Sequence, residues 1–189
     1  LKDTGIPTVA ISSSPVINNA NRTAYIVSGT CSENSRAVTV NVGGVSSSPT
    51  CTTNTWSATL NVTAVGDSAT VAITANHSDV AGNPATQASA SVLKDTVNPT
   101  VALTAPANIN SGNASAYPLS GTCSENGRTV SVNVGGVTAT PTCTASAWST
   151  SLNVSGVADS GSMAITANHS DDAGNNATQA SASVIKSTG

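Results

Sequence analysis

Short runs in which apolar and polar residues alternate recur along the whole chain. The run AVTVNV at 37–42 is one example, and ATVAITAN at 69–76 is another. A period of two places successive side chains on opposite faces of an extended strand, so these runs predict β-strands. In the first half of the chain we expect seven strands, at residues 7–12, 24–30, 37–42, 48–52, 56–62, 69–76 and 86–94.

Turn-forming residues separate these runs. Gly, Asn, Asp and Pro gather in the segments INNAN, SENS, VGG, TNT, VGDS and DVAGNP. These residues permit a positive φ or fix φ, as tight turns require. Leu, Glu, Lys and Met, which favour helices, are scarce, so we expect no helices. Seven short antiparallel strands in one domain are typical of a two-sheet sandwich of immunoglobulin type, and a barrel is the less favoured alternative.

The chain contains the same unit twice. When the sequence is shifted by 92 residues against itself, 61 of the 97 overlapping positions are identical and no gap is needed. Self-similarity over a period of domain size indicates tandem domains, and we place their boundary in VLKDTVNPT at 92–100. The sequence therefore predicts an all-β protein of two seven-stranded antiparallel immunoglobulin-like β-sandwiches, end to end, at residues 1–94 and 95–189.

Each repeat carries two cysteines that are 20 residues apart. The chain has two Trp, two Tyr and no Phe, so its core must be built from small aliphatic side chains. Such a core gains less free energy per buried residue, and a cross-link compensates for that. We predict the disulfides Cys31–Cys51 and Cys123–Cys143, and with them an oxidising compartment outside the cytosol. Free buried thiols are the alternative; zinc is disfavoured because no two cysteines stand two to four residues apart.

Charge and hydropathy exclude several functions. The net charge is -3 and the six Lys and Arg form no cluster, which disfavours binding to nucleic acid. No run of 18 apolar residues is present, so we expect no membrane insertion in this segment. Separately, we expect the chain to be an excerpt from a longer protein. The segment NHSD contains His77, Ser78 and Asp79, which are the residue types of a catalytic triad. Neighbouring residues of a strand point to opposite faces, so these side chains do not converge, and we expect no enzyme.

The nine carboxylates all fall in expected loops and none in an expected strand. In an immunoglobulin-type sandwich, the start of the first strand and the loops after the second and sixth strands meet at one pole. Grouped carboxylates repel one another unless a cation lies between them, and hard oxygen ligands favour calcium. At the junction between the repeats, the expected ligands are Asp67, Asp95, Glu125, Asp171, Asp172 and Asn175.

The first repeat offers a smaller set of oxygen ligands. Val80 stands where the second repeat has Asp172, so the expected ligands there are Asp3, Glu33, Asp79 and Asn83. A calcium ion shared at the junction would remove bending freedom and make the tandem domains a stiff rod. In the alternative interpretation these acids lie in solvated loops, where Asp often hydrogen-bonds its own backbone.

Several segments resemble the repeats of bacterial immunoglobulin-like domains of the Big type. They are KDTVNPTVALT, SGTCSENGRTVSVNVGGV, CTASAWS and DDAGNNAT, and the resemblance covers both repeats. Domains of this kind occur in long surface adhesins and in secreted fibrous proteins. In the calcium-dependent members, aspartates of the linker and of the D.AGN loop bind the ion. The resemblance thus implies this role for Asp95, Asp171 and Asp172, and for Asp3 and Asp79 in the first repeat.

The uniformity of the two repeats favours a structural role. They share the cysteines, the apolar positions and the polar loops, and neither carries an insertion of its own. We therefore expect spacer or stalk repeats of a bacterial surface or secreted adhesin-like protein, which project a distal binding region. Their partners would be neighbouring repeats of the same longer chain. The alternative is an adhesive module that contacts a glycan or protein ligand through its loops or sheet faces.

Overall fold

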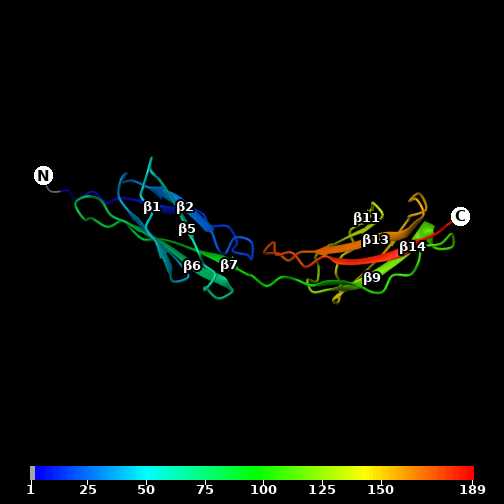
Figure 1. Cartoon of the computed structure of the whole chain (residues 1–189). Helices are drawn as coiled ribbons and strands as arrows, with labels where there is room; N and C mark the ends of the chain where they lie inside the picture. The colour runs from blue at the N-terminus through cyan, green and yellow to red at the C-terminus, as the bar shows by residue number, and fades with distance from the viewer. Residues whose placement is uncertain (1–2) are drawn as a thin grey trace. The chain divides into compact units, whose positions relative to one another are not determined.

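The computed structural model describes residues 3–189, which are divided into two compact units, with the division in sequence between Val97 and Asn98 (Figure 1). The strands of the first unit are β1 (Val9–Ser13), β2 (Tyr25–Cys31), β3 (Val38–Val42), β4 (Val45–Ser47), β5 (Thr55–Leu60), β6 (Ser68–His77) and β7 (Ala88–Lys94). Those of the second unit are β8 (Val101–Leu103), β9 (Tyr117–Cys123), β10 (Val130–Val134), β11 (Val137–Ala139), β12 (Ala147–Leu152), β13 (Ser160–His169) and β14 (Ala180–Lys186).

Each unit consists of a three-stranded and a four-stranded antiparallel sheet. The strand orders are β1-β2-β5 and β4-β3-β6-β7 in the first unit, and β8-β9-β12 and β11-β10-β13-β14 in the second. The protein is thus all-β, and the only helical element among the described residues is the 3-10 turn η1 (Ala114–Ala116). None of the described helical residues forms a segment long and apolar enough to cross a membrane.

The alternation seen in the sequence is the alternation of buried and exposed side chains. In β3, Val38, Val40 and Val42 are fully buried, and the residues between them are not. Buried residues of both sheets join in one apolar cluster, which also contains Tyr25 and Trp56. The second unit has an equivalent cluster of its own. Because full burial of a valine contributes roughly 1.5–3 kcal/mol, each unit has its own source of stability.

A glycine makes room for the tryptophan in each core. Gly29 of β2 pairs with Trp56 of β5, and a Cβ at Gly29 would lie 2.7 Å from the indole ring. The indole Nε1–H donates to the carbonyls of Ala10 and Thr30, at 3.2 and 3.1 Å. The ring therefore ties the two other strands of this sheet together. Gly121 and Trp148 repeat this close approach in the second unit, where the indole Nε1–H has no hydrogen-bond partner among the described residues.

Both predicted disulfides are present. Cys31 bonds to Cys51 and Cys123 to Cys143, with Cα atoms 6.0 Å apart in each pair, and no described cysteine is free. All four side chains are buried within the two apolar clusters. Each bridge thus joins the last residue of one strand of the three-stranded sheet to the segment that precedes the next strand of that sheet.

The strand predicted at 48–52 is wrong in its position. The structure places β4 at Val45–Ser47, where it pairs with β3 through the turn at Gly43 and Gly44. Both glycines have positive φ, 57° and 95°, so the hairpin closes directly after β3. Pro49 has no N–H to donate, and Cys51 lies in a segment with isolated bridges at Thr50 and Thr52 only.

We expect the double substitution Cys31→Ala with Cys51→Ala to destabilise the first unit by about 3 kcal/mol, because a closed loop of this size restricts the unfolded chain. Urea unfolding followed by tryptophan fluorescence measures this loss. The matched control is Cys123→Ala with Cys143→Ala, which should destabilise the second unit and leave the first unchanged. Equal midpoints for the variants and the parent protein would contradict the prediction.

Candidate functional site

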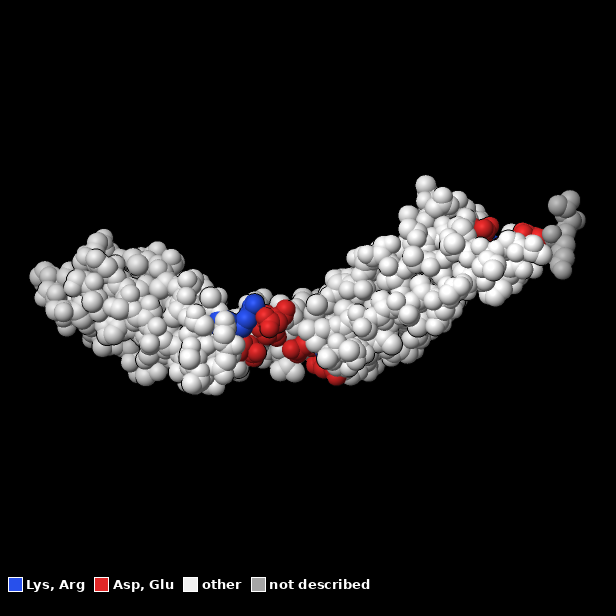
Figure 2. Space-filling model, turned by 180° about the vertical axis from the view of Figure 1, so that it is seen from behind, with Lys and Arg blue, Asp and Glu red and all other residues white. Residues whose placement is uncertain are grey.

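Charged side chains are rare on the surface. Figure 2 shows that most of the visible surface of each unit carries neither Lys and Arg nor Asp and Glu. The described residues form three ion pairs, Lys94–Asp67, Arg128–Asp172 and Lys186–Asp159. Because so few charges are present, each pair and each remaining charge is a candidate for a specific role.

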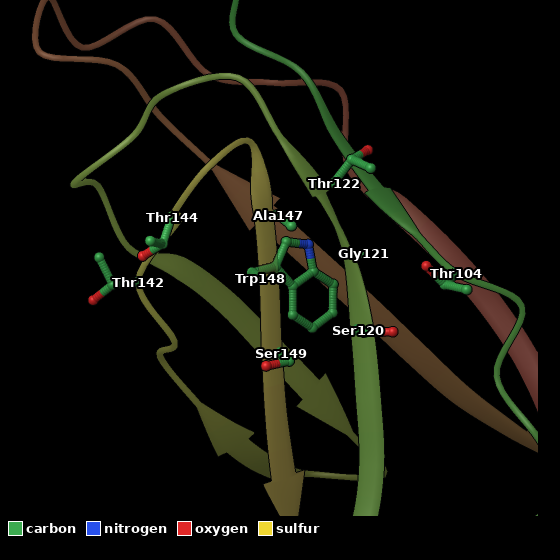
Figure 3. Close-up of a pocket in the computed structure, with 9 residues that line it drawn as sticks. All are labelled: Thr104, Ser120, Gly121, Thr122, Thr142, Thr144, Ala147, Trp148 and Ser149. Carbon is green, nitrogen blue, oxygen red and sulfur yellow. The ribbon is translucent and has the colours of Figure 1, made fainter.

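An uncharged shallow groove lies on the three-stranded sheet of each unit. In the second unit, the groove surrounds the side chain of Trp148, which belongs to β12 and lies against β9. The hydroxyl-bearing residues around it are Thr104, Ser120, Thr122, Thr142, Thr144 and Ser149 (Figure 3). The equivalent groove of the first unit surrounds Trp56. Both tryptophans are almost completely buried, so these grooves offer hydroxyl groups and no aromatic face.

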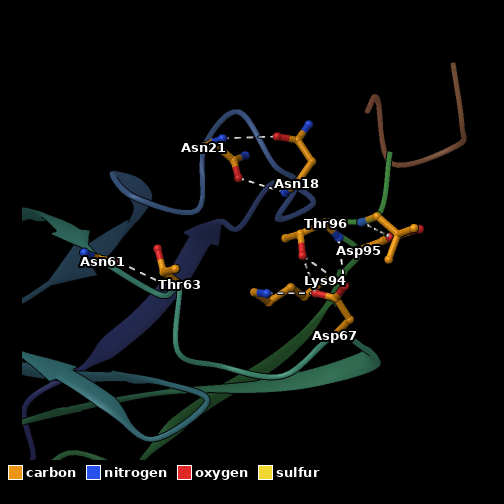
Figure 4. Close-up of polar contacts among 9 residues, drawn as sticks. Asn18, Asn21, Asn61, Thr63, Asp67, Lys94, Asp95 and Thr96 are labelled. Carbon is orange, nitrogen blue, oxygen red and sulfur yellow. Dashed lines mark hydrogen bonds and ion pairs between the residues drawn. The ribbon is translucent and has the colours of Figure 1, made fainter. Parts of the chain in front are cut away.

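A buried lysine closes the end of each unit. Lys94, the last residue of β7, is only 3% exposed, and its Nζ donates to Oδ1 of Asp67 at 2.8 Å (Figure 4). Asp67 Oδ2 accepts the backbone N–H of Thr96 at 3.0 Å, and the Thr96 hydroxyl also donates to this carboxylate. We call these three residues, and their equivalents in the second unit, the Lys-Asp-Thr clamp.

The second unit repeats the clamp with Lys186, Asp159 and Thr188. Lys186 Nζ lies 3.0 Å from Asp159 Oδ1, and the Thr188 N–H donates to Oδ2 at 3.0 Å. Hydrogen bonds from the Thr188 backbone and from Lys186 lower the pKa of Asp159 to about 2. The hydrogen bond from Lys94, followed by that from the Thr96 backbone, lowers the pKa of Asp67. Both carboxylates are therefore ionised at neutral pH.

The clamp fixes the segment that leaves the last strand of the unit. In the first unit, the Asp95 N–H also donates to the carbonyl of Ile17, and the Ile17 N–H donates to the carbonyl of Leu93. The sequence-based predictions assigned no role to Lys94 and so missed this one. The signal was present: an Asp is followed 27 residues later by Lys-x-Thr in both repeats.

The D.AGN loop forms a closed hydrogen-bonded turn in each unit. Asp79 is 5% exposed; its Oδ1 accepts the Asn83 N–H at 2.8 Å and its Oδ2 accepts the Asn83 side-chain amide at 2.7 Å. These bonds, the side-chain one foremost, lower the pKa of Asp79. Asp171 and Asn175 make the same two bonds at 2.8 Å each. The described residues include no cationic partner for Asp79 or Asp171 within ion-pair distance.

The structure brings together part of the ligand set predicted for the first unit. The Asn83 amide donates to the carbonyl oxygen of Asp3 at 3.2 Å, so Asp3, Asp79 and Asn83 lie side by side. The Asp3 carboxylate itself accepts the Gly5 N–H within its own turn. Glu33 accepts a hydrogen bond from the hydroxyl of Ser32. Within the described residues no three side chains of His, Cys, Asp or Glu form a cluster suited to a metal ion.

The junction set is distributed over both units, so its grouping stays a prediction. Asp67 is held in the clamp, and Asp95 accepts the N–H of Val97. Glu125 accepts a hydrogen bond from Ser124, and Asp172 pairs with Arg128 at 2.7 Å. A calcium ion at Asp67 or Asp172 would have to compete with a cationic side chain that is already bound there.

The two histidines have a structural role. His77 Nδ1 lies 3.0 Å from the carbonyl oxygen of Ala37, and its Nε2 accepts the Glu33 N–H at 3.2 Å. His169 makes the same contacts with Thr129 and Glu125. One ring nitrogen donates and the other accepts, which requires the neutral ring. Each histidine thus fastens the loop after β2 or β9 to the end of the long strand β6 or β13.

Comparison with known proteins identifies the fold. No protein-family model and no curated protein sequence matches the chain. Among solved structures, the fibronectin(III)-like modules of Clostridium thermocellum CbhA match at a TM-score of 0.58 and 19% identity, over 96% of this chain and 95% of that one. A Ca2+-stabilised adhesin that helps an Antarctic bacterium bind ice matches at a TM-score of 0.56 and 24% identity, over 99% of this chain.

A third structure, from a 1.5-MDa bacterial ice-binding adhesin, matches at a TM-score of 0.53 and 22% identity, over 99% of this chain. The chain spans 66% of that adhesin structure and 50% of the Antarctic one. At these identities the likeness establishes the fold alone: this chain has a fold found in bacterial adhesins and in fibronectin(III)-like modules.

The clamp predicts how stability depends on acid. A carboxylate with a lowered pKa contributes stability that is present above its unfolded pKa, near 3.8, and is lost as the pH falls through the folded pKa, which is about 2 for Asp159. We therefore expect the urea midpoint of the second unit to fall between pH 4 and pH 2. Asp159→Asn should lower the midpoint at pH 7 and flatten this dependence. An unchanged acid slope in the variant would refute the role of Asp159.

Proposed function

We propose that the chain is a pair of structural spacer repeats from a bacterial surface or secreted adhesin-like protein. In this proposal each unit is one immunoglobulin-like sandwich, and the repeats act outside the cell and without catalysis. One observation carries the proposal: within each unit, the chain enters at one pole and leaves at the other. A module of this design adds its own length to the longer chain in which it is placed.

In the first unit the two poles are the two ends of β6. The incoming segment lies beside the loops that follow β2 and β6, because Thr8 N–H donates to Ser32 Oγ and Asn83 donates to Asp3. The outgoing segment lies beside the loop that precedes β6, where Thr96 is bound to Asp67. Ten strand residues at about 3.3 Å each separate the two ends by roughly 30 Å.

The second unit has the same arrangement around β13. The Thr100 N–H donates to Ser124 Oγ at 2.9 Å, which places the incoming segment beside the loop after β9. Thr188 is bound to Asp159, immediately before β13. Each unit also has a separate core and a separate disulfide, so a load on the chain meets an independently stabilised module.

The comparisons support this proposal through the fold. Two of the similar structures are ice-binding bacterial adhesins, and the third consists of fibronectin(III)-like modules of CbhA. The partners of the present units would then be neighbouring repeats of the same chain. The second candidate function, an adhesive module for a glycan or protein ligand, is favoured by the hydroxyl-lined grooves around Trp56 and Trp148.

We also propose calcium as a ligand of the D.AGN loops. Asp79 and Asp171 favour this because they are buried and, within residues 3–189, the side chain that contacts each carboxylate is the uncharged amide of Asn83 or Asn175. The donor set is oxygen-based: the Asp79 carboxylate and the Asp3 carbonyl lie beside Asn83. Calcium takes six to eight oxygen ligands, so these residues supply one part of a coordination sphere. When bound, the ion would supply positive charge that these carboxylates otherwise lack.

Pulling the chain by its two ends tests the spacer function. We expect two unfolding events, one for each unit, because each core is separate. Reduction should lengthen each unfolding step by about 70 Å, since the 20-residue loop closed by the disulfide then extends at about 3.5 Å per residue. Cys31→Ala with Cys51→Ala is the control and should show the longer step in one unit without reductant. A single event, or extension without measurable resistance, would exclude a load-bearing spacer.

Thermal melting with calcium and with a chelator tests the ion. Calcium should raise the melting temperature in a concentration-dependent way, because a ligand that binds the folded state stabilises it. Asp79→Asn should remove the effect on the first unit and Asp171→Asn that on the second, while Asp67→Asn should leave both. Melting curves that are identical with calcium and with chelator would end the calcium proposal and leave the spacer proposal standing.

A further inference from the structure

One substitution between the repeats changes the surroundings of an otherwise identical arginine. In the second unit, Arg128 donates from one amino group to Asp172 Oδ1 at 2.7 Å and from the other to the carbonyl of Asp171 at 3.1 Å. In the first unit the equivalent arginine is Arg36, and the position of Asp172 is taken by Val80, which is 82% exposed. The first unit thus has the arginine without its carboxylate.

Arg36 is held at one nitrogen only. Its Nε donates to the carbonyl of Ser78 at 3.4 Å, just as Arg128 Nε donates to Ser170 at 3.5 Å. Among the described residues, its two terminal amino groups have no ion-pair or hydrogen-bond partner. A guanidinium group offers its donors in a planar fork that matches the two oxygens of a carboxylate. The Nε contact holds the root of this fork in place.

Arg36 lines a groove at the start of β3 and the end of β6. The groove has a volume of about 400 Å³, and its lining includes Ser35, Arg36, Thr39, Asn76, Ser78 and Pro84. Apart from Arg36 and the neutral His77, this lining is uncharged, and it offers hydroxyl and amide groups. The nearest acids by sequence and contact are Glu33, bound by Ser32, and Asp79, bound by Asn83; neither pairs with Arg36.

We propose that this groove binds an acidic sugar, such as a uronic acid residue of a polysaccharide, with its carboxylate on Arg36. One positive charge surrounded by neutral hydrogen-bonding groups suits a ligand with one carboxylate per ring and many hydroxyls. An acidic peptide offers carboxylates with few hydroxyl groups, whereas the lining of this groove offers hydroxyl and amide groups beside the single arginine. This binding site goes beyond the spacer function and is independent of it.

The second unit is a control that the chain itself supplies. Asp172 occupies the fork of Arg128 from within the same unit, so an external carboxylate would have to displace it. The site therefore exists in one repeat and is closed in the other. Because Val80 and Asp172 are both strongly exposed, exchanging these residue types should not disturb the core.

NMR titration of the intact chain with oligogalacturonate tests this proposal. The chain has three arginines, Arg22, Arg36 and Arg128, so each Nε–H signal reports on its own site. We expect the Arg36 signal to shift on titration and those of Arg22 and Arg128 to stay. Val80→Asp should weaken binding by about tenfold or more, since it replaces a charge-assisted hydrogen bond to the ligand. Arg36→Gln should do the same, and Asp172→Val should add a second site at Arg128.

The controls separate the possible ligands. A neutral oligosaccharide of the same length should leave the Arg36 signal unchanged, and so should a glutamate peptide of equal charge. Equal shifts of all three arginine signals, binding of the glutamate peptide in place of the sugar, or undiminished binding by Val80→Asp would each overturn the proposal. Amide spectra of the variants establish that each remains folded.

Discussion

The structure depends on burying a core of small aliphatic side chains between two sheets. Valine fills β3 and β10 at every inward position, and only one Trp and one Tyr per unit add larger surfaces. Such a core gains modest free energy for each residue that it orders. The disulfide adds what the core lacks, because it restricts the unfolded chain without requiring further apolar volume. The small core therefore limits how much stability apolar burial can supply in each unit.

The polar residues that remain are used at the two poles. At the outgoing pole, Asp67 and Lys94 bind each other and hold Thr96; at the incoming pole, Asp79 and Asn83 close a loop beside Asp3. Loops without apolar contacts open most easily in a β-protein, and hydrogen bonds to a carboxylate are stronger than those between neutral groups. The scarce charges thus stabilise the places that the core does not reach, which are also the places where the chain enters and leaves.

The strands and disulfides were accessible from the sequence because each depends on a local pattern. A period of two defines a strand, and two cysteines at a repeated spacing define a pair. The end of β7 at Lys94 was predicted correctly, but the role of the Lys94 side chain was not accessible in this way. Lys94 is the last residue of the strand, and its side chain is buried against Asp67, which is distant in sequence and near in space. The position of β4 was also missed, because the glycine turn closes the hairpin directly after β3 and Cys51 pairs instead with Ser35 and Arg36 through isolated backbone hydrogen bonds.

Val80 and Asp172 occupy equivalent positions in the two repeats, in a loop at the incoming pole. Charged groups at the poles stabilise loops that the core does not reach, so the loss of one of them calls for an explanation. Where a loop charge stabilises its own unit, its loss should be accompanied by the loss of its partner, because an unpaired charge contributes nothing to the fold. The repeats keep the clamp intact in both copies, with lysine, aspartate and threonine unchanged. Arg36, in contrast, is retained although Asp172 has no counterpart beside it. The Nε contact of Arg36 with Ser78 accounts for one of its donors, and the proposed ligand accounts for the fork that is left open.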